Sequence, residues 1–189
     1  MTDPEVRVRL PDWVAEVAPL GGVYRSDEAR IRLAVTLARE NVRRGTGGPF
    51  GAAIFEEESG RLVSVGVNSV VRLNNATLHA EMVAFMTAQA ALGNWSLGAP
   101  GLPAHTLATS CEPCAMCLGA VLWSGVRRVL TGASREDATR LGFDEGPVFP
   151  ESYRYLESRG IRFDRQVLRA EAVTVLEEYR RQGGVVYNG

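Results

Sequence analysis

The hydrophobic positions change their spacing several times along the chain, and each change marks a different element. Apolar residues recur at helical spacing in a segment that begins at Ser26 or Asp27 and ends near Val42. This pattern predicts an amphipathic helix with a polar residue capping its start. The next two apolar segments, 50–55 and 61–67, are short and joined by an acidic turn, so they predict a β-hairpin.

A polar stretch from Asn68 to Thr77 follows the hairpin and leads into a segment that is apolar on nearly all sides up to Leu92. Thr77 is the predicted N-cap of a helix there. A helix of this kind is buried, so we expect a sheet to pack on it. Strands are predicted at 106–109 and 127–132, with a helix between them, and such a connection makes the two strands parallel.

The two ends of the chain carry shorter predicted elements. A short helix capped by Asp12 lies in an N-terminal extension, residues 1–20, and Ser134 begins another short helix with a capping-box pattern. The C-terminal segment, 150–189, carries an amphipathic stretch at 151–159, a strand at 161–168 and a helix at about 170–182. The element order predicts a single α/β domain over residues 1–189, a three-layer α/β/α sandwich with a mixed central sheet.

Composition narrows the classes of partner. The chain has 189 residues, 46% of them hydrophobic, and a net charge of −1. No apolar run approaches the ~20 residues of a membrane span, so no membrane partner is expected. The charge balance gives no general attraction to nucleic acid, whose binders usually carry a basic face. Three cysteines without a signal-peptide pattern predict a reducing compartment, the cytoplasm.

Two separate motifs carry the candidate metal ligands. His79 stands in the first, His-Ala-Glu, and Cys114 and Cys117 stand in the second, Pro-Cys-Ala-Met-Cys. One imidazole and two thiols make three zinc ligands, and three protein ligands with one position left for water is the catalytic arrangement. The other histidine, His105, and the other cysteine, Cys111, lie beside a predicted strand, where we expect structural roles.

The spacing of these residues suits zinc chemistry. Cys114 and Cys117 share one side of a helix turn, and the positive helix N-terminus favours their thiolates. Glu81 is a glutamate that is not a ligand, two residues after His79. H-x-E with P-C-x-x-C is the signature of the zinc-dependent nucleobase deaminases. We therefore predict hydrolytic deamination with Zn²⁺ as the cofactor, in which Glu81 takes a proton from water and passes it to a ring nitrogen.

At these motifs the chain resembles the cytidine-deaminase-like superfamily, and more closely its bacterial guanine deaminase branch. The resemblance covers roughly residues 31–149 and is densest at 109–120 and 142–145. It implies that the zinc ligands and Glu81 act as above. The further residues that it implies for substrate contact are Asn68, Trp123 and Glu145, with Asp144 and Phe50 as additional candidates. Family members are dimers whose C-terminal segment crosses to the partner's site, which implies a homodimer in which Tyr187 approaches the other chain's substrate.

The preferred function is deamination of a free nucleobase, most simply guanine to xanthine and ammonia, in which Glu145 also belongs to the catalytic set. Another amino-heterocycle, such as cytosine or an aminotriazine, is an alternative substrate because it presents a similar amidine-like face. A tRNA adenosine deaminase shares the zinc motif but needs a basic surface. A non-enzymatic zinc-stabilised binding module is a third possibility, and the open ligand position together with Glu81 argues against it.

Overall fold

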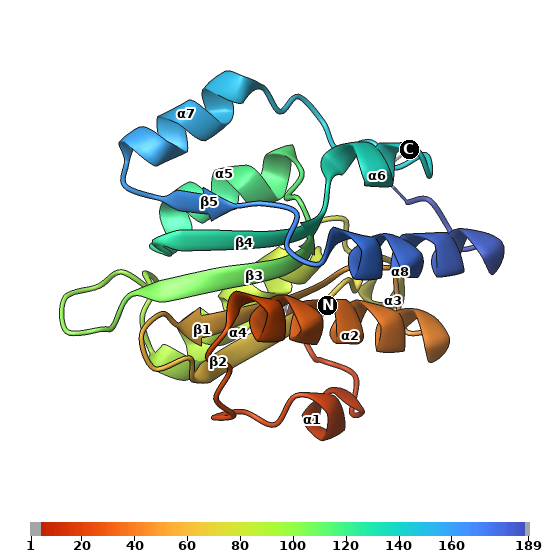
Figure 1. The fold of residues 1–189 in the computed structure, drawn as a ribbon. Coiled ribbons are helices and arrows are strands. Elements are labelled where there is room, and N and C mark those ends of the chain that lie inside the picture. The colour runs from red at the N-terminus through yellow and green to blue at the C-terminus, as the bar shows by residue number, and fades with distance from the viewer. Residues whose placement is uncertain (1–4, 188–189) are drawn as a thin grey trace.

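The computed structural model describes residues 5–187, and its centre is a five-stranded sheet in the order β2-β1-β3-β4-β5 (Figure 1). Strand β1 (Gly51–Glu56) pairs antiparallel with both β2 (Leu62–Val67) and β3 (His105–Cys111). Strands β3, β4 (Arg128–Ala133) and β5 (Arg162–Asp164) run parallel. The sheet is therefore mixed, as the sequence predicts.

Helices cover both faces of this sheet. One face carries α2 (Asp27–Arg43) and α8 (Arg169–Arg181), and the other carries α4 (Ala80–Leu92), α5 (Ala115–Ser124) and α7 (Pro150–Ser158).

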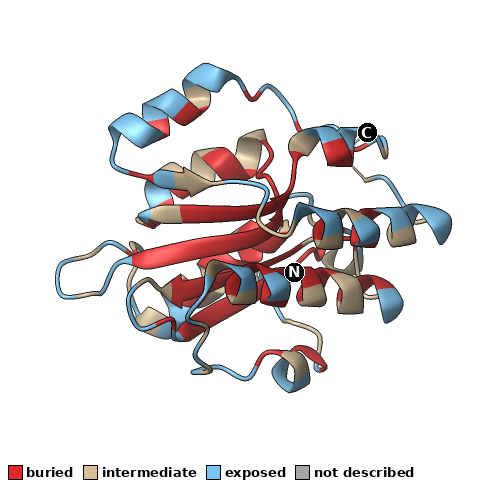
Figure 2. Ribbon diagram, viewed as in Figure 1, coloured by how far each residue is buried: buried red, intermediate tan, exposed pale blue. Residues whose placement is uncertain are grey.

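The sheet separates two hydrophobic clusters because neighbouring side chains on a strand point to opposite faces. On β1, Phe55 packs with the residues of α2 and α8, whereas Ile54 packs with those of α4 and α5. Figure 2 shows the central strands almost wholly buried, while α2 and α8 are buried on one side only. The three-layer α/β/α prediction is confirmed.

The N-terminal extension carries a short helix, α1 (Val14–Val17), that lies beside α2. The predicted cap by Asp12 is wrong: no side chain caps α1, and Asp12 instead accepts a hydrogen bond from Arg9 at 2.8 Å. Trp13 takes the N-cap position and is buried. The extension is therefore attached to the domain by an apolar side chain.

Two other helix starts differ in their outcome. Helix α4 begins at Ala80, and His79 occupies its N-cap position with an extended backbone. Thr77 does not cap the helix, since its amide and hydroxyl group both donate to the side chain of Asn75. The prediction for Thr77 is wrong. At α6 (Arg135–Thr139) the capping box of Ser134 and Asp137 is confirmed, with the Ser134 amide donating to the Asp137 carboxylate at 2.9 Å.

The polar stretch after β2 contains a short helix that the sequence pattern does not predict, α3 (Val70–Leu73). The predicted strand at 161–168 is shorter than expected, since β5 ends at Asp164. Gln166 and Leu168 have positive φ angles of 62° and 53°, which no strand accommodates. Between residues 5 and 187, no helix combines the length and apolar character that crossing a bilayer requires.

A glycine sets how closely α4 approaches the sheet. A Cβ atom at Gly66 of β2 would lie 2.0 Å from the carbonyl oxygen of Ala80 and 2.5 Å from the amide nitrogen of Ala84. Such a side chain cannot be accommodated without movement of backbone. Gly66 therefore allows the first turn of α4 to rest directly on β2, next to His79.

Candidate active site

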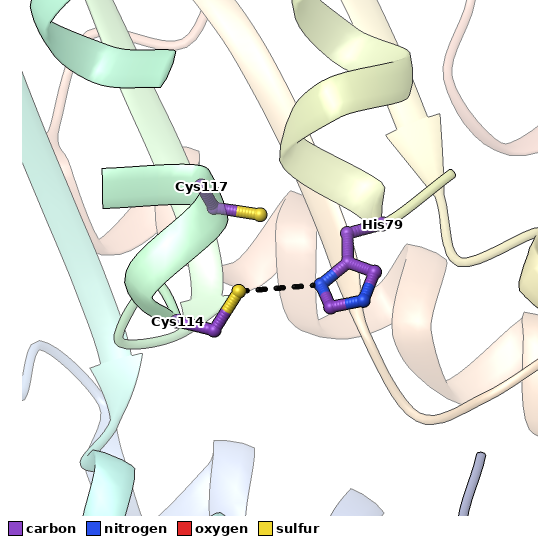
Figure 3. Close-up of side chains that lie close together, drawn as sticks. All are labelled: His79, Cys114 and Cys117. Carbon is purple, nitrogen blue, oxygen red and sulfur yellow. Dashed lines mark hydrogen bonds between the residues drawn. The ribbon is translucent and has the colours of Figure 1, made fainter. Parts of the chain in front are cut away.

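The three predicted zinc ligands come together between the N-terminal ends of α4 and α5 (Figure 3). His79 is the N-cap residue of α4, Cys114 is the N-cap residue of α5, and Cys117 lies in the first turn of α5. Their ligand atoms lie within 4.8 Å of one another. Within residues 5–187 they form the one cluster of histidine, cysteine and acidic side chains suited to a metal.

The donor set and its spacing fit zinc. The Cys114 Sγ and His79 Nδ1 atoms are 3.5 Å apart. A tetrahedral ion with Zn–S and Zn–N bonds of about 2.3 and 2.0–2.1 Å places such a pair about 3.5 Å apart. The remaining cysteine, Cys111, is buried at the end of β3 and donates to the carbonyl of Ser134. Cys111 is thus part of the core, as the sequence predicts.

The electrostatics of the cluster favour a thiolate. A hydrogen bond from Cys117 lowers the pKa of Cys114 to about 4, although burial acts in the opposite direction. Burial alone would lower the pKa of His79, but its hydrogen bond with Cys114 and the charge of Glu81 outweigh burial and raise it. One thiol is therefore already ionised near neutral pH, as a zinc ligand must be.

Glu81 lies beside the ligands without being one of the cluster. Its carboxylate accepts hydrogen bonds from Thr109 at 3.1 Å and from the Cys117 thiol at 3.5 Å. Burial raises the pKa of Glu81, and the negative charge of Cys114 adds to this effect. A carboxyl group with a raised pKa and a fixed orientation is suited to both accepting and releasing a proton.

A small, largely enclosed cavity opens beside His79 and Glu81. Its lining residues are Phe50, Asn68, His79, Glu81, Glu112, Cys114, Glu145 and Tyr187. The structure therefore gathers four of the predicted substrate contacts around the zinc cluster: Phe50, Asn68, Glu145 and Tyr187. The sequence motifs alone could not place them there, since they lie on four separate segments of the chain.

Asn68 stands immediately after β2 and is fully buried. Its Oδ1 atom accepts from the amide of Val70 at 3.4 Å, whereas its Nδ2 atom has no hydrogen-bond partner among the described residues. A buried donor without a partner costs free energy. The Asn68 amide thus offers a donor to a ligand in the cavity.

Glu145 reaches the cavity from the loop between α6 and α7, and its main-chain oxygen accepts from Ala115 at the start of α5 at 2.9 Å. Burial raises the pKa of Glu145 to about 8, and the charges of Cys114 and Glu81 add to the effect. The flanking Gly146 has a φ of 69°, and a Cβ there would lie 3.0 Å from that of Ala115. This glycine lets the loop lie close to α5.

Tyr187 closes the cavity from the C-terminal segment of the same chain. Its ring centroid is 6.2 Å from that of His79 and 5.3 Å from that of Phe143. Its hydroxyl group is buried without a partner among the described residues, and burial raises its pKa. Within one chain Tyr187 therefore lies at its own site, and exchange of this segment between subunits stays a prediction.

Two predicted contacts lie outside the cavity. Trp123 is at the far end of α5, 73% exposed, in a surface groove with Leu122 and Tyr155. Within one chain the expectation that Trp123 lines the base pocket is not met, because the α5 helix turns this side chain to the surface. Asp144 is exposed, and its carboxylate accepts from the amide of Gly146 at 2.8 Å, so it shapes the turn that presents Glu145.

Two buried polar residues near the site, Glu112 and Asn41, belong to no predicted set of functional residues. Glu112 lines the cavity and accepts from the amide of Arg135 at 3.1 Å, which ties the loop before Cys114 to the start of α6. Asn41 interrupts the apolar face of α2 and is fully buried. The sequence indicated Asn41 only by placing a polar residue within the apolar face of a predicted helix.

Comparison with known proteins agrees with this geometry. The family model for the cytidine and deoxycytidylate deaminase zinc-binding region matches residues 24–133, more than half of the chain. The chain belongs to this family. It is accordingly a zinc-dependent aminohydrolase, and His79, Cys114 and Cys117 suit the ligation of its zinc.

Similar proteins include guanine deaminases. The guanine deaminase of Bacillus subtilis (strain 168) is 39% identical over 153 residues, which are 81% of this chain and 93% of that protein. The solved guanine deaminase from Nitrosomonas europaea is 41% identical, with a TM-score of 0.89 and coverage of 94% of this chain and 97% of that chain. A further solved chain, NE0047 in complex with 2,6-diaminopurine, is 42% identical with a TM-score of 0.90, and 96% of each chain is covered.

Proposed function

We propose that this protein hydrolyses guanine to xanthine and ammonia. The observation that carries the proposal is the unpartnered Asn68 amide in the cavity beside the zinc cluster and Glu81. The similarity to two guanine deaminases over most of the chain supports the same substrate. A similar solved chain binds 2,6-diaminopurine, a purine with the 2-amino group that guanine also carries.

The cavity offers complementary groups for a purine. Asn68 Nδ2 donates to an acceptor atom of the base, while the Glu145 carboxyl group accepts from ring N–H groups. Phe50 and Tyr187 provide apolar walls, and Tyr187 excludes water from the reacting atoms. The net charge of −1 gives no general attraction to a polynucleotide, which favours a free base as the substrate.

The reaction exchanges the amino group on C2 of guanine for the oxygen of water. When bound, zinc lowers the pKa of a coordinated water to about 7. Glu81 takes a proton from the attacking water and delivers it to the ring nitrogen beside C2. It then carries the second proton to the amino group, which leaves as ammonia, and the ring keeps the oxygen as xanthine.

The test is ammonia release from guanine, cytosine, an aminotriazine, guanosine and a tRNA anticodon stem-loop. Guanine is expected to give the highest kcat/KM, with xanthine as the product. Glu81→Gln should keep zinc and lower kcat by at least about 10²-fold, because it removes the proton carrier. The matched control is Glu58→Gln in an exposed turn, which should leave turnover unchanged.

Glu145→Ala separates the substrate from the reaction class. It should lower kcat/KM for guanine by at least about 10²-fold, because a site built to bond a polar group loses that binding in the transition state. Unchanged guanine turnover by Glu145→Ala, or ammonia from cytosine but none from guanine, would reject guanine as substrate and leave the deaminase assignment intact.

We also propose a homodimer and a cytoplasmic location. The exposed side chains of Trp123 and Tyr155 make an apolar groove on α5 and α7 that a second chain could cover. Sedimentation equilibrium should give a dimer for the wild type and a smaller dimer fraction for Trp123→Asp. The three cysteines are free thiols, and two of them serve as zinc ligands, which a reducing compartment preserves.

A further inference from the structure

A buried hydrogen-bond network connects the N-terminal extension to Asn68. At its centre is Asn41, which has no solvent exposure. Its Nδ2 atom donates to the main-chain oxygens of Gly48 and Asn68, both at 2.9 Å. Its Oδ1 atom accepts from the hydroxyl group of Thr46 at 2.7 Å. The Asn41 amide is therefore fully engaged, and each of its bonds goes to a segment next to the cavity.

The loop between α2 and β1 presses directly on the same backbone. A Cβ atom at Gly47 would lie 2.0 Å from the main-chain oxygen of Asn68 and 2.7 Å from Asn41 Nδ2. The same loop continues into Phe50, whose main-chain oxygen accepts from the amide of Asn68 at 3.0 Å. The position of Asn68 is thus set from both sides by the loop and by Asn41.

The network continues outward to the extension. The indole Nε1 of Trp13 donates to Thr46 Oγ1 at 3.2 Å, so this hydroxyl accepts from Trp13 and donates to Asn41. The Arg44 guanidinium lies 5.5 Å from the Trp13 ring centroid, and Glu16 of α1 lies 3.8 Å from Arg44. Trp13 is only 6% exposed. The extension is thereby held against the end of α2, where Figure 1 shows α1 beside the domain.

We infer that Trp13, Thr46 and Asn41 are positioning residues that hold the base-binding Asn68 in place, so that the N-terminal extension takes part in substrate binding without touching the cavity. This inference rests on the proposed function. The Asn68 amide must meet an acceptor at about 2.7–3.2 Å, and a backbone shift of a few tenths of an ångström weakens that bond. Each residue of the network acts through the backbone of Asn68.

The network predicts which kinetic constant responds. The zinc ligands and Glu81 lie at the N-terminal ends of α4 and α5. The network instead connects α1 and α2 with the loop before β1 and with Asn68, directly after β2. Loosening Asn68 should therefore weaken binding of the base more than it slows the chemical step. A role confined to stability would lower the melting temperature and leave KM for the folded enzyme unchanged.

Thr46→Val tests this directly, because valine keeps the shape of threonine and leaves Trp13 Nε1 and Asn41 Oδ1 without a partner. We expect KM for guanine to rise about tenfold, because two buried hydrogen bonds are lost and each contributes about threefold, with kcat within about twofold. Thr46→Ser restores the hydroxyl and should restore KM. Thr36→Val is the matched control, since the Thr36 hydroxyl bonds only within α2 at 2.7 Å.

Trp13→Phe is the second variant, and it should raise KM in the same direction by about threefold because it removes only the outer bond. Its control is Trp95→Phe, whose side chain is 82% exposed. Zinc content and melting temperature of each variant identify any loss of folded enzyme.

The closing experiment is a double-mutant cycle with Asn68→Ala. If the network acts through Asn68, Thr46→Val should change KM by less than about twofold in the Asn68→Ala background. A KM for Thr46→Val equal to that of Thr36→Val, or a full tenfold effect without Asn68, would overturn the inference. Absence of guanine turnover by the wild type would instead reject the proposed function, and the cycle is then measured with whichever base of the panel the wild type deaminates.

Discussion

Replacement of Gly66 by alanine should disturb the site through the backbone of α4, without removing any group from the cavity. The added Cβ would lie 2.0 Å from the carbonyl oxygen of Ala80, and nonbonded heavy atoms are most stable at about 3.5–4.0 Å. The first turn of α4 must therefore move away from β2 by about 1.5–2 Å to restore an ordinary contact distance. His79 and Glu81 are on that turn or next to it, so both move relative to Cys114 and Cys117.

Two magnitudes follow from this displacement. Overpacking typically costs about 1–3 kcal/mol, and contact with the α4 backbone at both Ala80 and Ala84 puts Gly66→Ala at about 3 kcal/mol. For a chain of this length that corresponds to a fall in Tm of about 6–12 °C. A 1 Å misplacement of catalytic groups can lower kcat/KM by about 10²-fold.

Thermal unfolding, zinc content and ammonia release from guanine would measure these effects on the purified variant. The control is Glu58→Ala in an exposed turn, which should change the free energy of unfolding by less than about 0.5 kcal/mol. A Gly66→Ala protein with the Tm and kcat/KM of the wild type would refute the claim that the spacing of β2 and α4 positions the site.

Two further predictions concern the metal and an internal ion pair. Purified protein should contain about one zinc per chain. At a zinc concentration of about 1,000 times its Kd, binding stabilises the fold by about 4 kcal/mol, so chelation should lower Tm by about 8–16 °C. Zinc-supplemented protein that contains no metal would contradict the site. Asp137→Asn should destabilise the chain by about 2 kcal/mol at pH 7 in urea unfolding. Burial alone would raise the pKa of Asp137, but hydrogen bonds from Arg169 and Ser134 outweigh it and lower the pKa below 3.8. This stability is present above the unfolded pKa and is lost as the pH falls through the folded one, so the difference between wild type and Asp137→Asn should begin to shrink as the pH falls below 3.8. An equal difference at pH 7 and at about pH 3 would contradict the assignment.

The sequence by itself determined the elements and the metal ligands. Helical and alternating hydrophobic spacing was enough to predict the mixed sheet between two helical layers, because burial of one face imposes the period. The zinc cluster was predictable because Cys114 and Cys117 are three residues apart on one helix turn and His79 precedes Glu81 in a recognisable motif. Such local spacing holds in any fold that forms the two helices.

Local patterns were less reliable at the ends of elements. Thr77 and Asp12 have the composition of N-caps, but Thr77 bonds to Asn75 and Asp12 to Arg9. The strand predicted to extend to Leu168 ends at Asp164, since left-handed residues turn the chain toward α8. In each case a competing local hydrogen bond or backbone conformation outweighed the capping or strand propensity of the residue. Such propensities differ between residue types by only about 1 kcal/mol.

Tertiary structure alone decided which distant residues face the zinc cluster. Glu145 and Tyr187 reach the cavity from loops far along the chain, whereas Trp123, six residues after Cys117, is turned to the surface. Asn41 gains its partners only because α2 packs beside the loop at Gly48 and the end of β2. Contacts of this kind depend on how separately formed elements pack, and no spacing within one segment of sequence encodes them.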